Sequence, residues 1–268
     1  MDLRRHFSRR AAAFVFVIAL AYFTGIIISE RGWAEENLPL MSMTKPVISL
    51  TASRLIYKRG EKVKFVFTAR NTTSSTQALT FPSGQSYDLT ITGNGKDIWR
   101  WSVGKMFTMA IVHREIPPGE SLTYDITWDG KDKNGKPVPD GLYLAKAWLS
   151  TAGGSKPAAV TAMGIGKLIP SPIISIRKSA KKLTGKLVFV RAKLFGGALE
   201  CSQGWLVKDE TGGIDVCGPM PFTMGDKDRL AEMICTVKIS PPKDEPYLEY
   251  LSASLIMNIA GGTTHGIP

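Results

Sequence analysis

The sequence has few residues of the kinds that carry out catalysis near neutral pH. Its three histidines, His6, His113 and His265, are scattered along the chain. It contains no Gly-x-Ser-x-Gly elbow, no His-Glu-x-x-His motif and no glycine-rich phosphate loop followed by lysine and serine or threonine. We therefore expect a binding protein and not an enzyme. We also expect no cofactor and no metal site, because the histidines lack the spacing of a ligand set.

Cysteine is also scarce. The three cysteines, Cys201, Cys217 and Cys235, all fall in the C-terminal third of the chain. An odd number allows at most one disulfide and leaves one thiol over. Cys201 comes just before a predicted strand over 205–208, and Cys217 ends the strand predicted to pair with it. The candidate disulfide is therefore Cys201–Cys217, which would join a loop to the sheet.

The N-terminus has the pattern of a targeting segment. Arg4, Arg5, Arg9 and Arg10 precede an uninterrupted apolar run over 11–28, and Ser29-Glu30-Arg31 ends that run. This order predicts a signal peptide or a membrane-anchor helix over 1–34. Cleavage before Glu35 is left open. In either case we expect an extracytoplasmic location, with the protein secreted or held at the membrane by the uncleaved helix.

The rest of the sequence predicts an all-β protein. Apolar and polar residues alternate over short segments separated by turn residues, and no amphipathic helix is predicted. An Asn-Gly pair at 94–95 separates two such segments and indicates a tight hairpin. The strands expected before residue 169 are 47–52, 62–70, 88–92, 97–101, 121–128 and 142–149.

A second group of strands follows a proline-rich boundary. Two prolines in Ile169-Pro170-Ser171-Pro172 interrupt any sheet ladder, and the alternation then begins again. The strands expected there are 186–194, 205–208, 214–217, 230–239 and 247–256. We therefore predict two β domains, over 46–168 and 173–258.

Several motifs of the first domain resemble the BsuPI family of intracellular proteinase inhibitors. They occur in the order Arg70-Asn71-Thr72, Phe81–Asp88, Ile98–Ser102, Ile116–Glu120, Trp128-Asp129 and Val138–Tyr143. The resemblance implies an immunoglobulin-like β-sandwich that binds another protein and inhibits a proteinase. With the export signal, the expected partner is an extracytoplasmic serine protease.

No reactive loop is evident from the sequence, but two segments are candidates for binding. They contribute Ser83, Gly84, Gln85 and Ser86 from the first, and Phe107, His113 and Arg114 from the second. The alternative is that both segments only shape the sandwich. A different alternative is that the whole protein is a structural or assembly adaptor of the cell envelope.

The second domain resembles a small oligonucleotide/oligosaccharide-binding (OB) barrel. The string Trp205-Leu206-Val207-Lys208-Asp209, followed by Thr211-Gly212-Gly213-Ile214, is typical of the second hairpin of such barrels. Basic residues suggest polyanion binding as a further alternative, namely Lys181, Lys182, Lys186, Arg191 and Lys193. Export argues against nucleic acid as the partner, and a solvated basic face explains the same residues.

Overall fold

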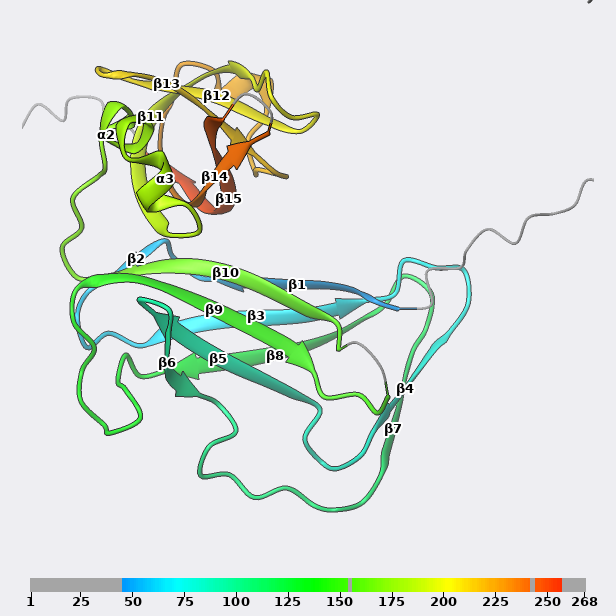
Figure 1. Ribbon diagram of the computed structural model, residues 1–268. Coiled ribbons are helices and arrows are strands. Elements are labelled where there is room, and N and C mark those ends of the chain that lie inside the picture. The colour runs from blue at the N-terminus through cyan, green and yellow to red at the C-terminus, as the bar shows by residue number, and fades with distance from the viewer. Residues whose placement is uncertain (1–44, 154–155, 242–243, 257–268) are drawn as a thin grey trace, which may run out of the picture. The chain divides into compact units, whose positions relative to one another are not determined.

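The computed structural model describes residues 45–153, 156–241 and 244–256 (Figure 1). The signal or anchor helix predicted for 1–34 lies outside these residues. In the described part, no helix is long and apolar enough to cross a membrane. The described residues are almost entirely strand and turn, so the all-β prediction is confirmed.

The first part of the chain forms two sheets and a separate two-stranded ribbon. One sheet has the order β1-β3-β8, the other has the order β2-β10-β9-β5-β6, and β4 pairs with β7 (Figure 1). The bounds are β1 Val47–Ala52, β2 Ile56–Tyr57, β3 Val63–Arg70, β4 Gln77–Phe81, β5 Tyr87–Gly93, β6 Lys96–Arg100, β7 Val112–Ile116, β8 Ser121–Trp128, β9 Gly141–Leu149 and β10 Ala158–Ile165. This is an immunoglobulin-like β-sandwich. The strands expected from the sequence do not include β2, β4, β7 and β10.

The sandwich core follows from the alternation of the strands. In β3, Val63, Phe65, Phe67 and Ala69 are buried, while the residues between them face outward. Trp128 at the end of β8 is fully buried and lies 5.9 Å, ring to ring, from Tyr143 on β9. Trp128 donates a hydrogen bond to the Lys131 carbonyl and Tyr143 donates one to the Pro139 carbonyl, both at 2.8 Å. The two rings therefore hold both ends of the long β8–β9 turn, as aromatic residues do when their polar atoms have partners.

The predicted hairpin at 93–95 is confirmed. Asn94 has a φ of 50° and Gly95 a φ of 74°, and β5 pairs with β6 on either side of them. Two successive positive φ values fit the tight turn whose twist matches that of the paired strands.

The second part of the chain is a closed five-stranded barrel of order β11-β12-β13-β15-β14. Its bounds are β11 Leu187–Gly197, β12 Gly204–Asp209, β13 Gly212–Cys217, β14 Leu230–Ser240 and β15 Glu245–Leu255, with a short 3-10 turn, η1, over Met224–Asp226. The pairing of β13 with β15 is parallel. Membership of the OB family and the domain boundaries 46–168 and 173–258 stay predictions.

Two short helices precede the barrel, contrary to the prediction that none is present. They are α2, Ile173–Lys178, and α3, Ala180–Leu183. Neither is long enough to show a helical period in the sequence. Ile173 and Ile176 of α2 lie in the barrel core, and the Ile173 amide donates to the Asp209 carboxylate at 2.8 Å. Tertiary contacts with the barrel therefore stabilise a helix that its own sequence does not indicate.

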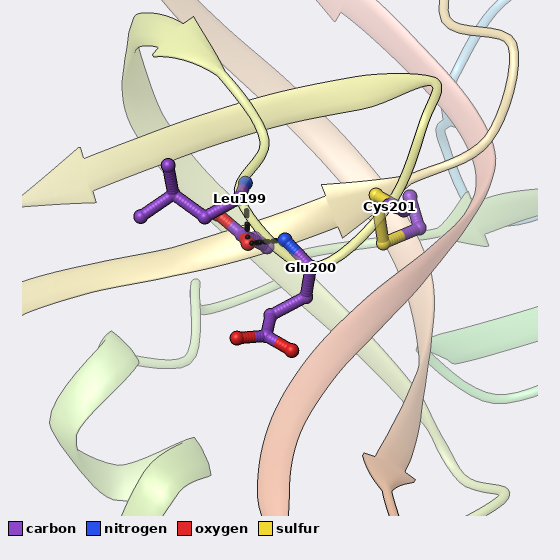
Figure 2. Close-up of a disulfide and its surroundings, with 5 residues drawn as sticks. Leu199, Glu200 and Cys201 are labelled. Atoms are coloured by element: carbon purple, nitrogen blue, oxygen red, sulfur yellow. Dashed lines mark hydrogen bonds between the residues drawn. A yellow bond between two sulfur atoms is a disulfide. The ribbon is translucent and has the colours of Figure 1, made fainter. Parts of the chain in front are cut away.

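The predicted disulfide between Cys201 and Cys217 is present (Figure 2). Gly204 lies opposite Cys217, and Trp205 lies opposite Val216. A Cβ atom at Gly204 would lie 2.2 Å from the Val216 carbonyl oxygen, so only glycine fits beside the cystine. Cys235 is a free, buried thiol of the barrel core.

A buried carboxylate holds the same loop beside the disulfide. Asp215 Oδ2 accepts hydrogen bonds from the amides of Leu199 and Glu200, both at 2.8 Å (Figure 2). Asp215 lies on β13, two residues before Cys217. The loop before β12 is thus attached to β13 by one covalent and two polar links.

Removing the disulfide should destabilise the barrel. We expect the double substitution Cys201→Ala and Cys217→Ala to lower the free energy of unfolding by about 3 kcal/mol, because the cross-link restricts the unfolded chain. Guanidinium chloride unfolding of the variant and of Ser202→Ala, an exposed neighbour, provides the measurement. Equal unfolding midpoints for the double variant and for Ser202→Ala would contradict this role.

Candidate functional site

The two predicted binding segments lie next to each other in the structure. The first lies within Pro82–Ser86, which connects β4 to β5. The second begins at Phe107 in the β6–β7 loop, Trp101–Ile111, which runs outside both sheets, and ends on β7 (Figure 1). The Gly84 amide donates to the Thr108 carbonyl at 2.9 Å. A Cβ atom at Gly84 would lie 2.6 Å from Thr108 Oγ1, so a larger residue at this position would have to displace the Thr108 side chain.

A buried carboxylate fixes the start of the β6–β7 loop. Asp88 on β5 has no exposed side-chain surface. It accepts hydrogen bonds from Arg100 Nε at 2.7 Å, from the Ser102 hydroxyl at 2.8 Å and from the Ser102 amide at 3.2 Å. A buried charge needs such partners, because without them its desolvation is not compensated. Asp88 therefore joins the end of β6 and the first turn of the loop to β5.

An aromatic chain extends from the core to the same loop. It consists of Phe67, Tyr124, Tyr87, Trp101 and Phe107, in that order. Successive ring centroids are 6.0, 4.5, 4.2 and 5.7 Å apart. Stacked and tilted pairs at these distances are favourable contacts between aromatic rings. Phe107 in the middle of the loop is thus connected to the fully buried Phe67.

Both tyrosines of the aromatic chain stay neutral at physiological pH. Burial raises the pKa of Tyr87 to about 12, and the neighbouring Tyr124 and Asp88 add to the shift. Burial also raises the pKa of Tyr124, although a hydrogen bond with Ser86 and the charge of Arg114 oppose the change. The tyrosines at the base of the loop are therefore uncharged. Ser86, one of the predicted binding residues, contributes to this base through its hydrogen bond with Tyr124.

The outer side of the β6–β7 loop is unusually apolar. The exposed fractions are 72% for Val103, 98% for Met106, 89% for Met109 and 65% for Ile111. Large exposed apolar side chains gathered on one segment are typical of an interaction site. The sequence prediction missed Val103, Met106, Met109 and Ile111 as binding residues. The sequence feature that could have indicated them is that the segment Val103–Ile111 is apolar but lacks the alternation of a strand.

The other two predicted binding residues lie on the ribbon formed by β4 and β7. His113 pairs with Thr80, and its Nδ1 lies 3.2 Å from the Thr80 hydroxyl. Arg114 pairs with Leu79 and acts on Tyr124 through its charge. Both residues flank the loop without forming part of it. Within the described ranges, no group of three or more acidic, histidine or cysteine side chains is arranged to hold a metal ion.

The basic residues of the second part are exposed, but two of them have acidic partners. Arg191 Nε lies 3.0 Å from a Glu232 carboxylate oxygen across β11 and β14. Lys181 Nζ lies 3.4 Å from a carboxylate oxygen of Asp244. The remaining exposed basic residues of the predicted set are Lys182, Lys186 and Lys193. The pairs reduce the local positive charge, and polyanion binding stays a prediction.

Residues 50–154 match the family model described as intracellular proteinase inhibitor, BsuPI. These residues are a BsuPI domain. The family recognised from the sequence motifs is thereby confirmed, and the match contains both candidate loops, the Asp88 site and the aromatic chain. The description is that of an inhibitor and not of an enzyme. A search of curated proteins found no match for the chain.

The predicted extracytoplasmic location is contradicted by the family match. The BsuPI family is described as intracellular. The prediction depended entirely on the charge and hydropathy of residues 1–34, which lie outside the described residues. Arginines followed by an apolar run satisfy the composition of an export signal without showing that the run is read as one.

The solved structures that match this chain are distant in sequence. The CARDB domain of a Pyrococcus furiosus protein is 11% identical, with 47% of this chain and 97% of that chain covered and a TM-score of 0.28. The Bacillus subtilis sporulation control protein Spo0M is 12% identical, with 72% and 75% covered and a TM-score of 0.30. Likeness at these TM-scores does not bear on function, so the sandwich is defined by its own strand pairing.

Replacing Asp88 should destabilise the BsuPI domain. We expect Asp88→Ala to lower the free energy of unfolding by about 3 kcal/mol, since Ser102 and Arg100 lose a buried charged partner. Urea unfolding measures the change. Asp97→Ala on β6, an exposed acidic residue, serves as the control and should change stability by less than about 0.5 kcal/mol. Equal effects of the two substitutions would show that the Asp88 links contribute nothing.

Replacing Trp101 should release the loop. Trp101→Ala removes two ring contacts, and we expect a loss of about 1–3 kcal/mol in the free energy of unfolding. Hydrogen exchange of the amides from Lys105 to Met109 should become faster at the same time. Unchanged exchange in that segment would mean that the aromatic chain does not hold the loop. Trp99→Ala, which removes a ring contact with Trp128 at 6.5 Å between centroids instead, is the matched control.

Proposed function

We propose that the protein inhibits a serine proteinase by presenting the β6–β7 loop of its BsuPI domain to the active-site cleft. It does so by binding and without catalysis of its own. The observation that carries the proposal is the apolar, exposed segment Val103–Ile111 on a fixed base. The family description supports a proteinase as the partner, and the serine class is our proposal.

The backbone of the loop supports this function. The segment Lys105–Met109 forms neither helix nor strand. Proteases bind peptide segments in extended form, and a segment outside the sheet ladders can offer its backbone to an enzyme. The Gly84–Thr108 hydrogen bond fixes the segment within the domain before a partner arrives.

The anchoring of the loop favours tight binding. Ordering a free peptide in a cleft costs conformational entropy for every immobilised side chain. In this domain the ordering is part of folding, because Asp88 and the aromatic chain already hold the loop. A rigid loop with outward apolar side chains therefore keeps more of its contact energy as affinity.

The test is inhibition of purified proteases by the full-length protein. We expect it to inhibit chymotrypsin or subtilisin with an inhibition constant of about 1 µM or lower, in the range of specific protein complexes. Replacing Met106, Met109 and Ile111 together by serine should weaken the inhibition by about 100-fold or more. Absence of inhibition of chymotrypsin, subtilisin and trypsin by the unaltered protein would overturn the proposal.

A matched control separates the loop from apolar surface in general. Val47, Val66 and Val160 are exposed valines on the strands of the sandwich. Replacing these three by serine should leave the inhibition constant within about threefold, because they lie outside the loop. An equal loss in both triple variants would contradict a role of the loop.

A further inference from the structure

Met106 is the most exposed large apolar residue of the β6–β7 loop, and both of its neighbours are attached to the domain. Its exposed fraction is 98%. On one side, the Lys105 amide donates to the Ser102 carbonyl at 3.2 Å. On the other side, the ring of Phe107 lies 5.7 Å from that of Trp101. Met106 is therefore held out from the domain between two fixed residues.

The other apolar residues of the loop lack this arrangement. Met109 follows the anchored Thr108 but precedes Ala110, which is itself exposed. Val103 and Ile111 are branched at Cβ and lie at the two ends of the segment. A methionine side chain is unbranched and has three rotatable bonds, so it enters a narrow apolar pocket with little steric restriction.

The basic neighbour is turned back toward the domain. The Lys105 ammonium lies 4.0 Å from the centre of the Trp101 ring. This cation–π contact is favourable, and it directs the charge away from an approaching enzyme. The loop therefore exposes the apolar side chain of Met106 to a partner, while the positive charge of Lys105 lies against Trp101.

We infer that Met106 occupies the specificity pocket of the protease, and that the partner is a serine protease whose specificity pocket is apolar. This inference rests on the proposed function and adds the residue and the class of enzyme. Such pockets distinguish proteases by the side chain that they accept, with an apolar slot in chymotrypsin and an anionic one in trypsin. The contacts of Lys105 and Phe107 act as positioning elements on either side.

The test compares Met106→Asp with Met109→Asp in the full-length protein. Met106→Asp should weaken inhibition of chymotrypsin or subtilisin by about 100-fold, because it places an unpaired charge in an apolar pocket. Met109→Asp introduces the same charge three residues away, at a contact residue outside the pocket, and should weaken inhibition at least about tenfold less than Met106→Asp does. Thermal unfolding of both variants shows that they are folded.

A second variant tests the class of enzyme. Met106→Arg should lose inhibition of chymotrypsin and gain inhibition of trypsin by about 10-fold or more, because the new side chain pairs with an anionic pocket. Lys105→Ala keeps the hydrogen bond from the residue 105 amide to the Ser102 carbonyl and removes only the contact with the Trp101 ring, so it should weaken inhibition of chymotrypsin by less than about tenfold. If the unaltered protein inhibits trypsin best and Lys105→Ala removes that inhibition, Lys105 is the specificity residue and the inference is wrong.

The outcomes also separate this inference from the proposed function. Inhibition by the unaltered protein that Met106→Asp and Met109→Asp weaken equally overturns the role of Met106 and leaves inhibition by the loop in place. Loss of inhibition in the triple serine variant combined with no effect of Met106→Asp leads to the same conclusion. Failure of the unaltered protein to inhibit any of the three enzymes overturns both.

Discussion

The buried carboxylate of Asp88 is the constraint on which the candidate site depends. Its partners, Arg100 and Ser102, lie at the end of β6 and in the first turn of the β6–β7 loop. A charge without solvent contact is tolerated only when its hydrogen bonds are satisfied, so the loop must begin where Ser102 meets Asp88. The adjoining Tyr87 then packs against Trp101, which contacts Phe107. Polar and aromatic contacts from two neighbouring residues of β5 therefore place the loop from Trp101 to Phe107, and the hydrogen bond between Gly84 and Thr108 holds the next residue.

The loop combines a rigid inner side with an apolar outer side. Phe107 and Trp101 pack toward the core, whereas Met106 and Met109 face solvent. Burying those methionines would stabilise the isolated domain, so their exposure gains nothing for folding. A partner that covers them provides the missing burial, and the fixed inner side limits the entropy lost on binding. This division of roles within one short segment is the physical basis of the proposed inhibition.

The barrel uses different means to fix a loop. The Cys201–Cys217 disulfide and the Asp215 carboxylate hold the segment before β12 against β13. The BsuPI match ends at residue 154, so the barrel and strand β10 lie beyond it. Strand β10 nevertheless pairs with β9 along its length and completes the five-stranded sheet.

The sequence by itself determined those features that depend on neighbouring residues. The alternation of β3, the Asn94-Gly95 turn and the two proline-separated sets of strands follow from side-chain period and backbone sterics. The family motifs predicted the sandwich, although the export pattern of residues 1–34 led to a wrong location. Only the tertiary structure decided which apolar residues are exposed, because the run from Lys105 to Ile111 has no period that assigns its sides. Met106 faces solvent and Phe107 faces inward because Trp101, Tyr87 and Gly84 come from segments that meet only in the folded chain.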